Sequence, residues 1–376
     1  MKILHLSDLH LGRRVNDFSM IDDQEHILGK ILEIAEKERP RAVLISGDVY
    51  DKSAPSAEAV QLFDDFLFEL ARRRLEVFVL SGNHDSPERI AFGSRLIDQS
   101  GVHLSPVYAG EIAQTVLIDE YGPVCFYMLP FVRQSSVRRF FPDVPIESAT
   151  DAVRAALSGI ERDPGLRRVL LAHQFVTGAA SSDSEDLSVG GSENVDASVF
   201  DGFDYVALGH LHSPQSVGSD RIRYCGSPLK YSFSEAEQQK SVSVAELGAK
   251  GELSVRRVPI VPLRDLRSVR GTFLQLTGQD AVPSEDYLRV VLTDEQEIPD
   301  VIGKLRALYP NVMRVEYDNR RTRAEALLSL PGEITGKTPL ELFAELYVRQ
   351  NGQPMSPEQE EFAASLAAAV WEEDAV

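Results

Sequence analysis

Five short segments of the chain carry residue types that bind metal ions. Each segment follows an apolar run and contains histidine, aspartate or asparagine; the five are Ser7-Asp8-Leu9-His10, Ser46-Gly47-Asp48-Val49-Tyr50-Asp51, Ser81-Gly82-Asn83-His84-Asp85, Ala172-His173 and Gly209-His210-Leu211-His212. They hold five of the eight histidines in the chain. Carboxylate, amide oxygen and neutral imidazole without thiolate suit manganese, iron, zinc or magnesium, and the share of nitrogen favours the first three.

The apolar runs that precede these segments have the composition of buried strands. They span residues 3–6, 42–45, 77–80, 169–171 and 205–208. In an α/β sheet, the loops beyond the carboxyl ends of the strands converge on one edge, where ligands usually bind. The pattern therefore predicts one cleft that gathers eight donors: Asp8, His10, Asp48, Asn83, His84, His173, His210 and His212. Glycines before Asp48, Asn83 and His210 are expected to allow the sharp turns that face these groups toward the cleft.

Eight donors are more than one ion needs, and two ions that share a bridging carboxylate would use them economically. Centres with two ions about 3.5–4 Å apart activate a water molecule and stabilise the attacking and leaving oxygens of a phosphate ester. Taken singly, each segment has a plainer interpretation; an Asn-His pair, for example, can cap a helix or close a turn. Five such segments at five strand ends together indicate a two-metal phosphoesterase.

The motif series resembles that of the calcineurin-like metallophosphoesterase superfamily. The matching motifs are Asp8-x-His10, Gly47-Asp48-x-x-Asp51, Gly82-Asn83-His84-Asp85, His173 and Gly209-His210-x-His212. Residues 5–12, 203–212 and 224–235 are similar to one branch, the nuclease subunits of bacterial DNA-repair complexes. The resemblance spans the chain. It implies an α/β core of two packed mixed β-sheets flanked by helices, a small α+β capping domain and a C-terminal helical hairpin.

The resemblance also implies a role for each motif position. Asp48 would bridge two divalent ions, with manganese the preferred metal. The other ligands would divide into two sets, Asp8, His10 and His212 for one ion and Asn83, His173 and His210 for the other. His84 would be a catalytic residue that binds no metal and assists departure of the leaving oxygen. Asp51 would orient His84, although an ordinary turn cap explains Asp51 equally well.

The activity implied by the resemblance is hydrolysis of DNA phosphodiester bonds. Members of the branch are single-strand endonucleases and, with a coiled-coil ATPase partner, double-strand exonucleases in DNA end processing, repair and recombination. They act as homodimers, and the C-terminal hairpin would bind the ATPase. Two alternatives stay open from the sequence: a small-molecule phosphodiesterase with the same core, and a non-catalytic scaffold for assembly.

Composition bounds these interpretations. The 376 residues are 43% hydrophobic, which excludes wholesale disorder. No apolar run approaches the ~20 residues of a membrane helix, the eighth residue is an acid, and only two cysteines are present, so a cytoplasmic protein is expected. The net charge of −19 opposes nucleic-acid binding, although bound metal ions can supply positive charge. The basic residues nearest the first motif, Arg13 and Arg14, are the proposed DNA contacts, and Arg133 with Arg138 and Arg139 is a second candidate.

The chain is expected to contain four parts: a nuclease domain at 1–262, a capping domain at 263–325, a linker at 326–337 and the hairpin at 338–376. Helices are predicted at about 21–39, 56–74 and 151–160, and three strands with a helix near 298–308 in the second part. Capping boxes begin both hairpin helices, at Thr338 and Ser356. Such a pair cannot bury its apolar faces alone, so it either folds back on its own domain or binds a partner. Residues 178–191 predict a mobile loop.

The remaining histidines and both cysteines are expected to be structural. His5 alternates with core residues on a strand, His26 lies early in a helix, and His103 lies near a predicted strand. Cys125 and Cys225 are expected to be small buried side chains.

Overall fold

The computed structural model describes residues 1–160, 163, 165–185, 193–279 and 281–322, with short pieces at 343–344, 347–348, 354–360 and 362–364. The chain divides into two compact units, Met1–Arg267 and Ser268–Val376. None of the helices in the described ranges is long and apolar enough to cross a membrane. The predicted linker at 326–337 and most of the hairpin at 338–376 lie outside the described residues.

The first sheet of unit 1 has six strands. In spatial order they are β14 (Leu253–Pro259), β13 (Ser241–Leu247), β1 (Lys2–Leu6), β4 (Ala42–Ser46), β5 (Glu76–Leu80) and β6 (Val102–Leu104). Strands β1, β4, β5 and β6 are parallel to one another, whereas β13 is antiparallel to both of its neighbours, β1 and β14. The carboxyl ends of β1, β4 and β5 therefore meet at one edge.

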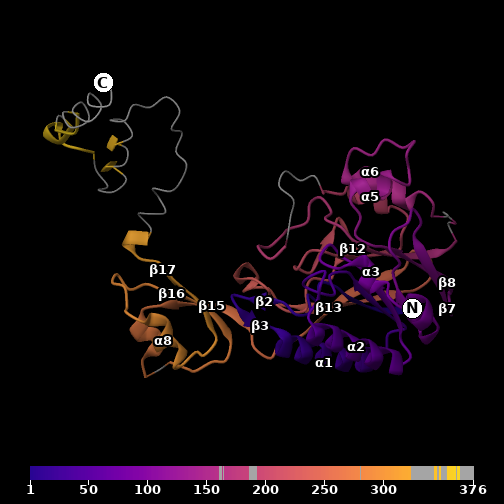
Figure 1. The fold of residues 1–376 in the computed structure, drawn as a ribbon, viewed down its shortest axis with the longest axis horizontal. Coiled ribbons are helices and arrows are strands. Elements are labelled where there is room, and N and C mark those ends of the chain that lie inside the picture. Colours follow the sequence, from indigo (N-terminus) through magenta and orange to yellow (C-terminus); the bar gives the residue numbers. More distant parts are fainter. Residues whose placement is uncertain are drawn as a thin grey trace. The chain divides into compact units, whose positions relative to one another are not determined.

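Two helices accompany the first sheet, α1 (Ile21–Glu38) and α2 (Ala57–Arg72), and both confirm the sequence prediction (Figure 1). Local interactions determine where α2 begins and where α1 ends. Ser56 caps α2 by accepting a hydrogen bond from the Ala59 amide at 3.3 Å. Arg39 takes a left-handed conformation after α1, and Pro40 cannot continue the helix.

The second sheet of unit 1 also has six strands. Their order is β11 (Gln215–Val217), β12 (Ser219–Tyr224), β10 (Tyr205–Gly209), β9 (Arg167–His173), β8 (Gly122–Leu129) and β7 (Ala113–Asp119). The four central strands are parallel and the two edge strands are antiparallel to their neighbours. Helices α5 (Gln134–Arg138) and α6 (Ala149–Leu157) accompany this sheet (Figure 1).

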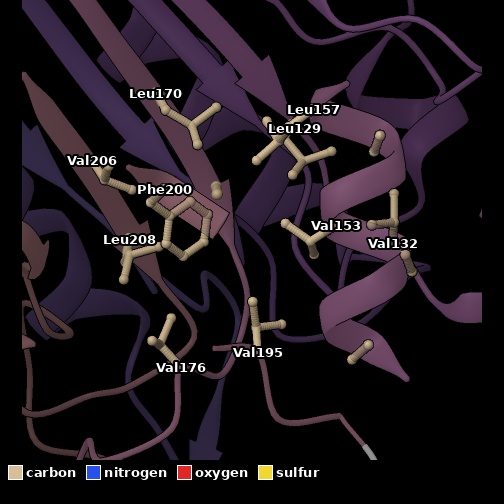
Figure 2. Close-up of a cluster of buried hydrophobic side chains, with 14 of the residues drawn as sticks. Leu129, Val132, Val153, Leu157, Leu170, Val176, Val195, Phe200, Val206 and Leu208 are labelled. Atoms are coloured by element: carbon tan, nitrogen blue, oxygen red, sulfur yellow. The ribbon is translucent and has the colours of Figure 1, made fainter. Parts of the chain in front are cut away.

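The second sheet is buried on both faces, and its strands alternate between two cores. On β9, Val169 and Leu171 face the first sheet, where they pack with Leu44 and Phe78. Leu170 and Ala172 face the opposite way. Figure 2 shows this second core, in which Leu170, Val206 and Leu208 of the strands face Val153 and Leu157 of α6. The prediction of two packed mixed sheets with helices outside is therefore confirmed.

Short elements complete unit 1. They are the hairpin of β2 (Arg14–Val15) and β3 (Phe18–Ser19), the short helices α3 (Pro87–Ile90) and α4 (Ser94–Ile97), and the 3-10 turns η1 (Asp98–Ser100), η2 (Ala197–Phe200) and η3 (Phe233–Glu235).

Residues 266–317 form a small α+β fold, as predicted. Strands β15 (Leu266–Gly271), β16 (Tyr287–Leu292) and β17 (Val312–Tyr317) form one sheet, with α8 (Val301–Arg306) near the expected position. A further helix, α7 (Phe273–Thr277), was not predicted because it is only five residues long. In the C-terminal pieces, the predicted cap at Ser356 is confirmed by reciprocal hydrogen bonds with Gln359 at 2.9 and 3.3 Å. The cap predicted at Thr338 lies outside the described residues.

The core between the sheets predicts a large stability effect at Phe126. Its ring is fully buried and stacks on Phe78 with centroids 4.6 Å apart. Phe126→Ala is expected to lower the free energy of unfolding by about 3–5 kcal/mol, because it leaves a cavity that the two sheets cannot close. Denaturant titration measures the loss. Val116→Ala on the exposed side of β7 is the matched control, with an expected change within about 0.5 kcal/mol; equal effects would contradict this account of the core.

Candidate metal centre

The five predicted segments meet between the carboxyl ends of strands from both sheets. Asp8 and His10 follow β1, Asp48 follows β4, and Asn83 and His84 follow β5. His173 is the last residue of β9, and His210 and His212 follow β10. Two hydrogen bonds join the sheets here. The His210 amide donates to Asp8 Oδ1 at 2.8 Å, and His173 Nδ1 donates to the Ser46 carbonyl at 2.8 Å.

One group of donors consists of Asp8, His10 and His212. Their ligand atoms lie within 4.8 Å of one another, and all three residues are buried. The Nε2 atoms of His10 and His212 are 3.0 Å apart. Among the described residues, Asp8 Oδ2 has no hydrogen-bond donor despite its burial. Two imidazole nitrogens beside an unpaired buried carboxylate oxygen form a donor set that fits a divalent cation.

A second group surrounds Asn83. Its Oδ1 lies 3.0 Å from His173 Nε2 and 3.1 Å from His210 Nδ1. An amide oxygen and two imidazoles in contact form a second donor set without thiolate. The structure thus brings together all the residues for which the sequence predicted metal binding.

Asp48 lies between the two groups. Its Oδ2 is 3.3 Å from His173 Nε2 and 3.7 Å from His10 Nε2. Its Oδ1 accepts a hydrogen bond from the His84 amide at 3.0 Å. The carboxylate is therefore in reach of both donor sets at once, which is the position that a bridging ligand requires.

The pKa values in the cluster show that its buried carboxylates are stabilised by positive charge. Burial disfavours a charged Asp48, yet His173 beside it holds the pKa of Asp48 well below its usual range. Burial likewise opposes charge on His173, but the Asp48 carboxylate raises the pKa of His173 to about 9. Burial raises the pKa of Asp8 to about 6 and lowers that of His210 to about 3. A bound cation would supply the charge that a protonated His173 otherwise provides.

The backbone at the cluster is strained and closely packed. Four donors have positive φ values, namely Asp8 (54°), His10 (45°), Asp48 (49°) and His210 (101°). Such strain concentrates at functional sites. Glycines before the donors serve two purposes. Gly47 takes a φ of 89°, the sharp turn that the sequence predicted, whereas a Cβ at Gly82 would lie 2.1 Å from Asp48 Oδ1. Gly82 is therefore needed for space.

His84 lies at the rim of the cluster, and Asp51 holds it through the backbone. His84 Nδ1 donates to the Asp51 carbonyl at 3.0 Å. The Asp51 carboxylate lies 3.4 Å from the Arg13 guanidinium and 3.8 Å from His10 Nδ1. The sequence placed Asp51 next to His84, but the orienting contact with its carbonyl oxygen is available to any residue at that position.

Family models match most of the chain. The calcineurin-like phosphoesterase model covers residues 1–214, and the model described as "Type 5 capsule protein repressor C-terminal domain" covers residues 262–351. The chain is 35% identical over 322 residues to the D subunit of the SbcCD nuclease of Staphylococcus epidermidis, a match that covers 83% of this chain and 84% of that protein. The protein of the same name from Staphylococcus saprophyticus is 34% identical over 319 residues, with the same coverage. The chain belongs to the SbcD family of calcineurin-like phosphoesterases.

Solved structures similar to the SbcD-family chain are more distant in sequence. A dimetal phosphatase from Danio rerio is 12% identical, with a TM-score of 0.40 over 70% of this chain and 98% of that one. A protein of Thermus thermophilus is 14% identical, with a TM-score of 0.34 over 68% of this chain and 98% of that one.

The sequence did not predict the residues that hold His212 in the SbcD-family chain. Ser184 Oγ lies 2.7 Å from His212 Nδ1 and donates its proton to the fully buried Glu235 carboxylate. Although burial favours neutral Glu235, the nearby His212 imidazole and the Lys240 ammonium hold the pKa of Glu235 well below its usual range. Because Glu235 only accepts, Ser184 Oγ must accept from His212 Nδ1–H, which leaves the Nε2 lone pair for a metal.

The backbone of His212 is held as firmly as its ring. Its amide donates to Glu185 Oε1 at 2.6 Å, and its carbonyl accepts from Lys240 Nζ at 2.8 Å. Ser184 and Glu185 belong to the segment predicted as a mobile loop, of which the structure describes residues 178–185. Glu235 is the last residue of the stretch 224–235 that resembles the family. That resemblance is the sequence signal that could have indicated a role for Glu235.

Asp85 was quoted in a motif without a role, and the structure shows what it does. Its buried carboxylate accepts hydrogen bonds from the amides of Val49 and Tyr50 at 3.1 and 2.9 Å and from Gly82 at 2.9 Å. It thereby joins the loop after β4 to the loop after β5, and so fixes Asp48 relative to Asn83.

The residues expected to be structural lie outside the cluster. His5 is buried and bonded to the Tyr205 hydroxyl at 2.9 Å, and His103 lies between Asp98 and Glu76. Cys125 and Cys225 are both free and buried, as predicted.

The contact between Ser184 and His212 predicts a loss of metal affinity in Ser184→Ala. Without the hydroxyl, His212 loses the acceptor that fixes its tautomer, so manganese affinity is expected to fall about 10- to 100-fold. Isothermal titration calorimetry of the metal-free protein with Mn²⁺ measures the change. Ser158→Ala, at the exposed end of α6, is the matched control. Unchanged affinity in Ser184→Ala would remove Ser184 from the site.

Proposed function

We propose that this SbcD-family chain is a metal-dependent DNA nuclease. It hydrolyses phosphodiester bonds as a single-strand endonuclease and, with an SbcC-type ATPase, as a double-strand exonuclease in DNA end processing, repair and recombination. The observation that carries the proposal is the convergence of six donors around Asp48 with His84 at their rim. The relatives named as nuclease subunits support DNA as the substrate class.

The donors would hold two divalent ions. Their mixture of nitrogen and oxygen suits manganese, iron or zinc, and manganese is the metal that the family resemblance implies. Asp48 would contribute to both ions. One ion would be held by Asp8, His10 and His212, and the other by Asn83, His173 and His210. When bound, the ions activate water and offset the charge of the phosphate.

His84 acts on the leaving group. Its Nδ1–H is held by the Asp51 carbonyl, which fixes the ring and directs the other nitrogen to proton transfer. His84 gives a proton or hydrogen bond to the sugar oxygen as that oxygen departs. Asp51 takes part in the reaction only as a positioning residue. Its carbonyl oxygen orients His84, and its carboxylate pairs with Arg13.

Arg13 and Arg14 are the proposed DNA contacts beside this centre. Arg13 donates to the Ser184 carbonyl at 3.1 Å, and its guanidinium lies 5.1 Å from the centre of the Tyr231 ring. It is thus placed near the ligands His10 and His212, which also pack against Tyr231. Arg14 is exposed on the β2–β3 hairpin.

The chain works with partners. We assign residues 1–262 to the nuclease domain, 263–325 to a capping domain that orients DNA, and 338–376 to a hairpin, joined by the linker 326–337, that binds a coiled-coil ATPase of the SbcC type. The relatives are named as one component of an SbcCD nuclease, which supports such a partner. Two copies of the chain form a homodimer.

His84→Ala tests the nuclease function. The parent chain is expected to nick supercoiled plasmid in Mn²⁺ and to cut oligonucleotides in preference to nucleotide monoesters. The variant is expected to lose about 100- to 10,000-fold in kcat, because proton transfer to the leaving group is lost. Its metal content and DNA affinity should persist. His26→Ala on α1 is the matched control. A variant that cuts at nearly the parent rate would remove His84 from the reaction, and a parent that only hydrolyses monoesters would exclude DNA as the substrate.

Asp48→Ala tests the bridging role. Because Asp48 contacts both donor sets, its loss is expected to remove both ions together, whereas loss of a terminal ligand weakens one. Elemental analysis after dialysis against limiting Mn²⁺ counts the ions per chain. Asp64→Ala on the exposed face of α2 should retain the parent content. Two ions retained by Asp48→Ala would contradict the bridging role.

A further inference from the structure

A partly exposed phenylalanine lies against the ligand cluster. Phe131, in the loop between β8 and α5, has its ring centre 6.3 Å from that of His173 and 6.5 Å from that of His210. Its ring is nearly parallel to His210, at 16°. It belongs neither to the core between the sheets nor to the core beneath α6. Core packing therefore does not account for an aromatic side chain at this position.

The backbone fixes Phe131 relative to the metal ligands. Its amide donates to the Ser81 carbonyl at 3.1 Å, which ties its loop to the segment after β5 that contains Asn83. Phe175, directly beyond β9, approaches His210 from another side with ring centres 6.3 Å apart. The imidazoles of the second donor set are thus flanked by phenyl rings.

A cation accompanies this ring. The Arg133 guanidinium lies 5.3 Å from the centre of Phe131, and 66% of the Arg133 side chain is exposed. Its contact with Glu193 is 3.8 Å long and the Arg133 side chain lies mostly in solvent, so the pair contributes little free energy. Proteins bind single-stranded nucleic acid with aromatic rings that stack the bases and with nearby cations that attract the backbone. Phe131 and Arg133 supply one of each.

We propose that Phe131 and Arg133 form a nucleobase subsite beside the metal centre. The ring stacks a base next to the phosphodiester bond that is cut, and the guanidinium binds an adjacent phosphate. The inference rests on the proposed function, because a scissile phosphate at His173 and His210 places its neighbouring nucleotides beside Phe131. A base can stack here only when it has left the duplex, so the subsite favours single-stranded DNA of any sequence.

Comparison of a base-bearing and a base-free strand tests the subsite. Oligothymidylate and an abasic strand of equal length carry the same phosphates, so their affinity ratio isolates the contribution of the bases. Fluorescence anisotropy in Mn²⁺ measures both affinities without cleavage when every chain compared, the parent included, also carries His84→Ala, which is expected to keep metal and DNA binding. The parent is expected to favour oligothymidylate, and Phe131→Ala to lower the ratio by about 5- to 100-fold. Phe131→Trp should keep the ratio because it keeps a ring. Phe68→Ala, an exposed phenylalanine on α2, is the matched control.

Two arginine variants test the phosphate contact separately from the stacking. Arg133→Ala should weaken both strands alike, since it removes a phosphate contact, whereas Arg154→Ala on α6 should weaken neither. A parent that binds both strands equally, or a Phe131→Ala variant that keeps the parent ratio, would overturn the subsite. Cleavage in Mn²⁺ is scored separately. A parent that cuts neither strand would contradict the proposed nuclease while the affinity ratio still decides whether Phe131 stacks bases.

Discussion

Two buried carboxylates, Asp8 and Asp48, impose the constraint around which the rest of unit 1 is arranged. Both are almost fully removed from solvent, where an unpaired anion is costly. The chain meets this cost with imidazoles from both sheets, and the Asp48 carboxylate raises the pKa of the His173 beside it. A divalent cation meets the same need without a proton. Because it binds the folded arrangement alone, it also stabilises that arrangement by linkage.

The constraint determines how the two sheets meet. On β9 the residues that face the first sheet are Val169, Leu171 and then His173, so the metal centre continues the apolar core along the same strand face. On β10, Gly209 occupies the corresponding place after Ala207. A Cβ there would lie 2.0 Å from the Ser46 carbonyl oxygen. Strands from opposite sheets can therefore approach closely enough to share one cluster only because Gly209 has no side chain. The donor residues Asp8, His10, Asp48 and His210 adopt the strained positive φ values.

The sequence predicted the ligand cluster because its signal is local. Each donor directly follows an apolar run, and the topology of parallel strands brings such positions to one edge. The residues that hold the ligands left no comparable signal. Ser184 lies 28 residues from His212, and its role depends on a turn that brings Glu235 beside it. The family resemblance indicated Asp51, but its contact with His84 uses the carbonyl oxygen, which no residue type reveals. The sequence did not indicate Phe131, because its possible role depends on the contact with His210, which only the folded structure shows.

The charge of −19 remains to be reconciled with an anionic substrate. Part of the negative charge lies far along the chain, since residues 331–376 contain nine acidic and two basic side chains. Near the cluster, Arg13 is already paired with Asp51, which reduces the positive charge that it can offer to a phosphate. Attraction for the strand must then come from bound cations, from exposed Arg133 and from contacts that do not depend on charge. Stacking on an aromatic ring is such a contact, and it is insensitive to the repulsion that an acidic surface creates. Under the proposed function, such contacts allow an acidic chain to bind single-stranded DNA beside its metal centre.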